Sequence, residues 1–135
     1  MSNPAFALQD AMRAALLAHA PLVSLLQGQH VFEEMPRGAS TSHVSFGDIE
    51  TRDWSVKDEK AHEHFAMLSV RTNSRSRKLA HDVVSEIEAA LDNVQLTLAG
   101  HTLVNLRLVF WAVNREKNGE NIAATLRFRA ATEPL

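Results

Sequence analysis

Residues 73–93, NSRSRKLAHDVVSEIEAALDN, decide the fold of this chain. Asn73 or Ser74 can act as N-cap, because a short side-chain oxygen accepts a hydrogen bond from a free amide of the first turn. Apolar residues then recur at three- and four-residue spacing, which forms one stripe along a helix: Ala80, Val83, Val84, Ile87, Ala90 and Leu91. The segments on both sides have strand patterns. We therefore predict a helix at about 74–92 that covers one face of a sheet.

The remaining chain predicts a single α+β domain over 1–135, with a mixed or antiparallel sheet. A second helix is expected to start at Asn3-Pro4 and to pack on the sheet, because proline suits the first helical position. The most hydrophobic segment, LVNLRLVFWAV, is expected in the middle of the sheet. AHEHFAMLSVRT is apolar on both faces, which predicts a central strand covered on two sides. Asn118-Gly119 indicates a type I′ hairpin turn. Strands are expected near 30–34, 43–50, 61–72, 95–99, 102–115 and 121–132.

The predicted core combines the helix stripe with the inward positions of the strands. Its members are Leu68, Val70, Val84, Ile87, Leu91, Leu106, Leu108, Leu126 and Phe128.

The composition excludes some classes of protein. At 135 residues the chain can bury a sizeable core, and its net charge of −2 argues against a dedicated DNA-binding domain. It has no cysteine, so disulfides, thiolate metal sites and thiol nucleophiles are excluded. The N-terminus, MSNPAFALQDAMRAALLAHA, is amphipathic. It predicts neither a signal peptide nor a membrane span.

Two groups of side chains could carry chemistry. His62 and His64 are two apart on a predicted strand, so both could ligate a metal, with His43 or Asp48 as a third ligand. Polar residues at a strand entrance are the more ordinary interpretation. Five acidic residues either provide a carboxylate pair for acid–base catalysis or lie in a solvated loop: Asp48, Glu50, Asp53, Asp58 and Glu59. Because no nucleophile elbow, phosphate loop, dinucleotide fingerprint or HExxH helix is present, we predict no catalytic residue, cofactor or metal.

A third group is basic. Arg107, Arg127 and Arg129 are expected to share a sheet face with Trp111, either against nucleic acid or in a protein interface. The near-zero net charge favours the protein interface, because it provides no general attraction to phosphate. Trp54, in a polar segment, folds back on the core or anchors a neighbouring subunit.

Several segments, in order, resemble the tail-completion family of long-tailed bacteriophages and gene transfer agents, also called tail terminators or head–tail joining proteins. They are LQDAMRAALLAHAPLVSLL, VFEEMPRGASTSHVSFGDIETRDWS, HEHFAMLSVRTNSRSRKLAHDVVSEIEAAL and LAGHTLVNLRLVFWAVNREKNGENIAATLRFRAATE. The resemblance covers nearly the whole chain, including the P-x-G…V-x-F-G-D run from Pro36 to Asp48.

The resemblance implies a structural virion protein without catalytic residues, assembled in the bacterial cytoplasm. Family members form a ring, usually of six subunits, at the head-proximal end of the tail tube. The ring ends tube polymerisation and joins the tail to the head connector or adaptor, while DNA passes through its lumen without sequence-specific binding. No membrane is involved. The residues expected to contact neighbours or DNA are Trp54, Lys57, Asp58, Glu59, Lys60, Arg127 and Arg129.

Two other classes of function stay open on the residues alone. A nucleic-acid-binding module would need a positive surface with exposed aromatic side chains. A small α+β enzyme would need a pocket with convergent polar groups.

Overall fold

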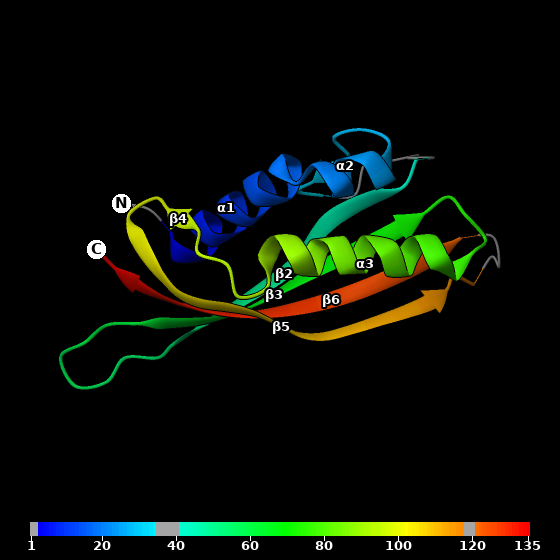
Figure 1. Ribbon diagram of the computed structural model, residues 1–135. Helices are drawn as coiled ribbons and strands as arrows, with labels where there is room; N and C mark the ends of the chain where they lie inside the picture. The colour runs from blue at the N-terminus through cyan, green and yellow to red at the C-terminus, as the bar shows by residue number, and fades with distance from the viewer. Residues whose placement is uncertain (1–2, 35–40, 118–120) are drawn as a thin grey trace.

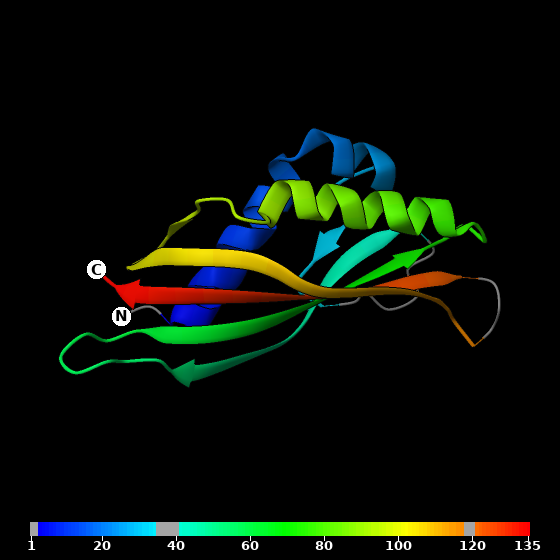
Figure 2. The same ribbon diagram turned by 60° about the horizontal axis from the view of Figure 1, so that its bottom comes forward.

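A computed structural model describes residues 3–34, 41–117 and 121–135, which form three helices and a six-stranded sheet (Figure 1). The helices lie on one side of a strongly twisted sheet, as the turned view shows (Figure 2). The fold is α+β, as predicted. The elements are α1 (Pro4–Ala18), α2 (Ala20–Leu26), β1 (Val31–Phe32), β2 (His43–Asp53), β3 (His62–Thr72), α3 (Arg77–Leu91), β4 (Thr97–Leu98), β5 (His101–Arg115) and β6 (Ile122–Pro134).

The long helix α3 begins later than the sequence predicts. Its N-cap is Ser76, whose side chain accepts a hydrogen bond from the Lys78 amide at 3.2 Å. Asn73, directly after the end of β3, is not available for this role. Its side chain accepts a hydrogen bond from Ser42 Oγ at 3.0 Å. The predicted stripe is confirmed: five of its six members are buried and Ala90 is partly buried.

The strand order is β1-β2-β3-β6-β5-β4, with β1 parallel to β2 and every other neighbour antiparallel. β3 and β6 therefore form the middle of the sheet. The prediction that LVNLRLVFWAV lies in the middle is wrong, because β5 has only the two-residue β4 on its outer side. Its apolar residues are divided between the core and the surface.

The helices cover only one face of β3. Ala66, Leu68 and Val70 are buried on that face, whereas Phe65 and Met67 on the opposite face are partly buried. The prediction of cover on two sides is wrong. We call the face that includes Phe65 and Met67 the open face, because no helix among the described residues lies on it.

The core lies between the helices and the opposite face of the sheet. Eight of the nine predicted core residues are buried, and Leu108 packs against them partly buried. α1 adds Leu8, Met12 and Leu16. The helix starts as predicted, with Asn3 Oδ1 accepting hydrogen bonds from the amides of Ala5 at 2.8 Å and Phe6 at 3.1 Å.

Two further sequence predictions concern single segments. Asn118 and Gly119 lie outside the described residues, so the turn type of that hairpin stays a prediction. No helix among the described residues is long and apolar enough to cross a membrane.

Candidate assembly surfaces

The open face carries the three arginines that the sequence groups together. Arg107 stands opposite Arg129 in the β5–β6 register, and Arg127 stands opposite Phe110. Trp111 does not share this face. An irregularity between Leu108 and Phe110 shifts the alternation by one residue, so Trp111 is on the helix side, with its ring 5.7 Å from that of His81 on α3.

The arginines of the open face differ in their partners. Arg129 donates from Nε to the Glu63 carboxylate at 2.7 Å and from Nη1 to Asn105 Oδ1 at 3.1 Å. Arg52 binds the same carboxylate, and Arg107 pairs with Asp92 at 3.1 Å. Hydrogen bonds from Arg129 and then Arg52 hold the pKa of Glu63 below its usual value.

Arg127 differs from these three arginines in its exposure and its lack of a carboxylate partner among the described residues. It is exposed, and the described residues provide no ion pair for it. The face as a whole is not a basic strip, because Arg52, Arg107 and Arg129 are each paired with a carboxylate. This arrangement does not supply the free positive surface that a nucleic-acid-binding module needs.

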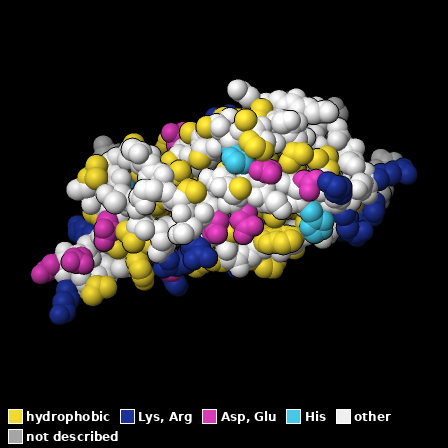
Figure 3. Space-filling model, in the orientation of Figure 1, with side chains coloured by type: hydrophobic (Ala, Val, Ile, Leu, Met, Phe, Trp, Pro, Cys, Tyr) yellow, Lys and Arg dark blue, Asp and Glu magenta, His cyan; other side chains and the backbone are white. Residues whose placement is uncertain are grey.

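The loop between β2 and β3 projects beyond the rest of the sheet (Figure 1). Acidic and basic side chains crowd its tip at the lower left of Figure 3. The predicted contact residues from Lys57 to Lys60 are all exposed at this tip, where Val56 forms an isolated bridge with Glu59. We call residues 54–61 the projecting loop.

Trp54 stands at the base of the projecting loop. Its ring lies under the Arg129 guanidinium, 5.0 Å from ring centroid to Cζ, while the side chain stays 44% exposed. The residue thus folds back on the open face of the sheet and not on the core, and its role as an anchor for a neighbouring subunit stays a prediction.

The apolar surface of β5 is the feature that sequence reasoning missed as a site. Val104 and Val109 occupy the two irregular positions of the strand, and both are about half exposed, at 45% and 50%. Phe110 and Trp111 follow at 52% and 44%. The hydrophobic richness of this segment was the available signal. In the structure it belongs to an exposed sheet edge instead of a central strand.

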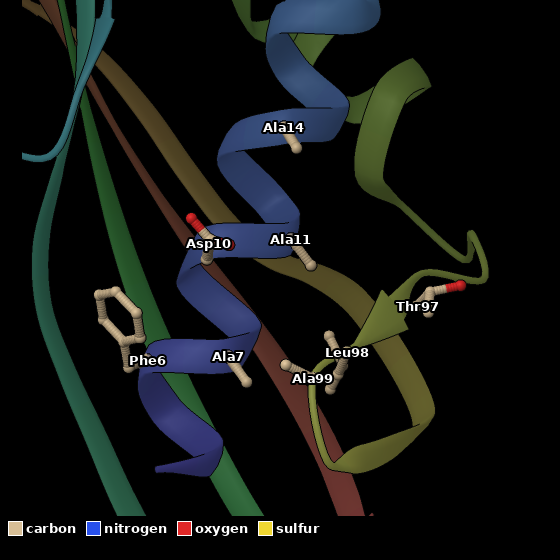
Figure 4. A pocket seen from close by; sticks show the side chains of 8 residues that line it. All are labelled: Phe6, Ala7, Asp10, Ala11, Ala14, Thr97, Leu98 and Ala99. Atoms are coloured by element: carbon tan, nitrogen blue, oxygen red, sulfur yellow. The ribbon is translucent and has the colours of Figure 1, made fainter. Parts of the chain in front are cut away.

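A shallow apolar groove lies between α1 and β4 (Figure 4). It has a volume of about 470 Å³ and is lined by Phe6, Ala7, Asp10, Ala11, Ala14, Thr97, Leu98 and Ala99. Asp10 is the one ionisable group of the lining. The groove therefore lacks the convergent polar groups that an enzyme pocket would need.

The histidine pair does not form the metal site that the sequence left open as an alternative. His64 is buried, and both its ring nitrogens are engaged, by Thr51 Oγ1 and Thr132 Oγ1, each at 2.8 Å. Within the described ranges, no three His, Asp or Glu side chains are grouped to hold a metal ion. His43 lies at the other end of β2, opposite Arg71. Burial, with smaller effects of His62 and His101, lowers the pKa of His64 to about 4.

The candidate carboxylates for acid–base chemistry are solvated. Asp48, Glu50, Asp53, Asp58 and Glu59 are all exposed. Hydrogen bonds from the Ser55 side chain and amide lower the pKa of Asp53, which favours its ionised form. A general acid would need the opposite shift.

These surfaces define a class of protein: a small assembly subunit, with apolar residues along an exposed sheet edge and a charged projecting loop. The sequence profile of the family described as "Tail completion protein gp17" matches residues 10–133, so the chain belongs to the tail completion protein gp17 family. It is a structural protein of the virion tail, as the resemblance implied. No curated protein matches the chain.

A solved structure extends this result to three dimensions. A chain described as "Virion of native gene transfer agent (GTA) particle" superposes with a TM-score of 0.87 at 28% sequence identity. The alignment covers 98% of this chain and 99% of that one. The fold of this chain is thus that of a protein assembled in a virion, over essentially its whole length.

Proposed function

We propose that the protein forms a closed homomeric ring, most simply of six copies, at the head-proximal end of the tail tube. The ring ends polymerisation of the tube and joins the tail to the head connector or adaptor protein. DNA passes through its lumen. The observation that carries this proposal is the match to a chain of the gene transfer agent virion along nearly the whole of both chains, within a family of tail completion proteins.

The sheet supports a ring because its two edges, along β5 and β2, carry different kinds of side chain. A ring forms when one surface of each subunit binds a different surface of the next, and the rotation closes. β5 offers an apolar edge with Phe110 and Trp111, and β2 offers a polar edge with Asp48 and Glu50. Unlike surfaces of this kind favour a head-to-tail contact over a symmetric dimer.

The charge supports passage of DNA without retention. Non-specific affinity for DNA depends on lysine and arginine contacts to phosphate, and the chain has a net charge of −2. Four of the five arginines on the open face, Arg52, Arg71, Arg107 and Arg129, are also neutralised by carboxylates. A lumen built from such subunits attracts the phosphate backbone weakly, so DNA can slide.

The contacts to the tube and the connector are proposed for the projecting parts of the subunit. Lys57–Lys60 at the tip of the projecting loop extend farthest and carry both signs of charge. Trp54 at its base and Arg127 on the open face are exposed beside other polar groups. Arg129, which holds Trp54, contributes to the shape of this surface.

Deletion of the gene tests the proposal. Electron microscopy of lysates should then show filled heads separated from tails, with tubes of uneven length, and expression of the gene from a plasmid should restore joined particles. Purified protein should form a closed ring when imaged or when its mass is measured across a range of concentrations. Normal joined particles from the deletion strain would refute the function.

A further inference from the structure

The sheet leaves two edges without a strand partner among the described residues. β4 pairs with β5 only at His101 and Thr102. The chain after α3 then covers the edge as far as Leu108, whose amide donates to Asp92 Oδ1 at 2.8 Å. Residues 109–115 continue the strand beyond this cover. On the other side, β1 pairs only with Val44 and Ser45, and residues 47–53 continue β2 beyond it.

The two edges have the directions that pairing between copies requires. β2, β3, β6 and β5 are four strands in successive antiparallel arrangement. Since four is even, β5 of one copy runs antiparallel to β2 of a neighbour that stands beside it in the same orientation. A cyclic ring repeats this relation at every contact, so one kind of antiparallel pairing would close it.

The positions of the edges also suit closure. By cross-strand register, Glu50 is level with Arg107 of the same copy. If the middle of 47–53 in one copy pairs with Ala112 of the neighbouring copy, each copy is displaced relative to the one before it. The displacement is roughly four residues, or about 14 Å, along the strands. Four strands are about 19 Å wide, so the strands would tilt by about 35°, which is the tilt of closed barrels.

The side chains of the two edges are complementary. Arg127 stands beside Phe110 on the open face, one strand in from the β5 edge, and Glu50 stands on the same face of the β2 edge, opposite Phe65. Both are exposed, and neither has an ion pair within the described residues. Phe110 would lose its exposed apolar surface when β2 of a neighbour lies against it.

We propose that the occupant of the β5 edge is a second copy of this chain. Residues 109–115 of one copy pair antiparallel with residues 47–53 of the next. Glu50 then lies opposite Ala112, and Arg127 reaches it diagonally, past Phe110, to form an ion pair across the contact. The inference rests on the ring proposed above and assigns its lateral surfaces. The resulting sheet is continuous around the ring, with main-chain hydrogen bonds at every subunit boundary.

Charge exchange at the two positions tests this contact. Arg127→Glu alone and Glu50→Arg alone each oppose like charges, and should raise the concentration needed for assembly on the order of tenfold or more. The double variant restores the pair and should assemble like the parent. Mixing the two single variants should also restore rings, with the copies in alternation, because each mixed contact again joins opposite charges. Sedimentation and native mass measurement distinguish these species.

Control variants show whether an effect on assembly depends on these two positions or on any change of surface charge. A complementation assay then tests the edge contact separately from the proposed function. Lys78→Glu and Glu88→Arg change exposed charges on α3 and should not alter assembly. Single variants that assemble normally, or a mixture that stays dissociated, would overturn the edge contact. The same variants are also expressed in the deletion strain, where both singles should fail to join particles and the double should succeed. If the deletion strain needs the gene but accepts both single variants, the function stands and the edge assignment fails.

Discussion

Arg129 on β6 binds Glu63 on β3 at 2.7 Å between Nε and the carboxylate, across the two central strands of the open face. The Glu63 side chain is nearly buried, at 7% exposure, because Arg129 and Arg52 approach it from both neighbouring strands. Arg129 also holds the Trp54 ring. One ion pair thus connects the middle of the sheet with the base of the projecting loop.

Arg127 and Arg129 should respond differently to charge reversal, although they alternate on the same face. Arg129→Glu places a second carboxylate beside the nearly buried Glu63 and should lower the melting temperature by several degrees. Arg127→Glu changes an exposed residue and should alter the unfolding free energy by roughly 0.5 kcal/mol or less. Thermal unfolding followed by circular dichroism compares the two, with Arg129→Lys as a variant that keeps the charge. Equal melting temperatures for the two glutamate variants would contradict the role given to the Glu63 pair.

Truncation of the α3 stripe should be costly. Ile87 is fully buried against the sheet, and Ile87→Ala should lower the unfolding free energy by about 2–5 kcal/mol, the range for large-to-small core changes. Glu88→Ala, on the exposed side of the same helix, is the matched control and should change it little. Urea titration of both variants measures the difference. A melting temperature near that of the parent for Ile87→Ala would show that another face of the helix is buried.

Stability should fall in mild acid because of His64. Its pKa is about 4 in the folded protein and about 6.5 when unfolded, so between these values the unfolded chain binds a proton that the folded one does not. Stability is therefore present above about pH 6.5 and is lost as the pH falls toward 4. Between pH 7 and pH 5 the loss should be about 2 kcal/mol.

His64→Gln should remove most of this pH dependence. The effect of Glu63 has the same sign but lies below pH 4.5, since the pKa of that carboxyl is lowered from 4.5. His81→Gln, which changes an exposed histidine on α3, is the control and should keep the slope of the parent. Urea unfolding at pH 7 and pH 5 provides the comparison. An unchanged slope in His64→Gln would mean that another group titrates in this window.

The tip of the projecting loop should matter for joining and not for folding. Replacing residues 57–60 by glycine and serine removes four exposed charges. The melting temperature should stay within a few degrees of the parent, because no core contact is lost. Joined particles should become rare in the complemented deletion strain. Full joining with a normal melting temperature would remove this loop from the proposed contacts.

The sequence by itself determined the elements and much of the core. The three- and four-residue spacing from Ala80 to Leu91 is a local property, and it predicts a buried helix face whatever lies beneath it. The same holds for the Asn3-Pro4 helix start. The family resemblance, carried by weak signals along the whole chain, identified a tail-completion protein that the profile match then confirmed.

Only the tertiary structure decided the order of the strands and the side chains that reach the surface. Hydrophobicity does not distinguish a central strand from an edge strand with exposed apolar side chains, so the sequence alone predicts β5 in the middle of the sheet. One irregularity near Val109 moved Trp111 to the other face, since each extra residue inverts a period of two. The pairing of Arg129 with Glu63, 66 residues away in sequence, likewise depends on register, which no local pattern contains.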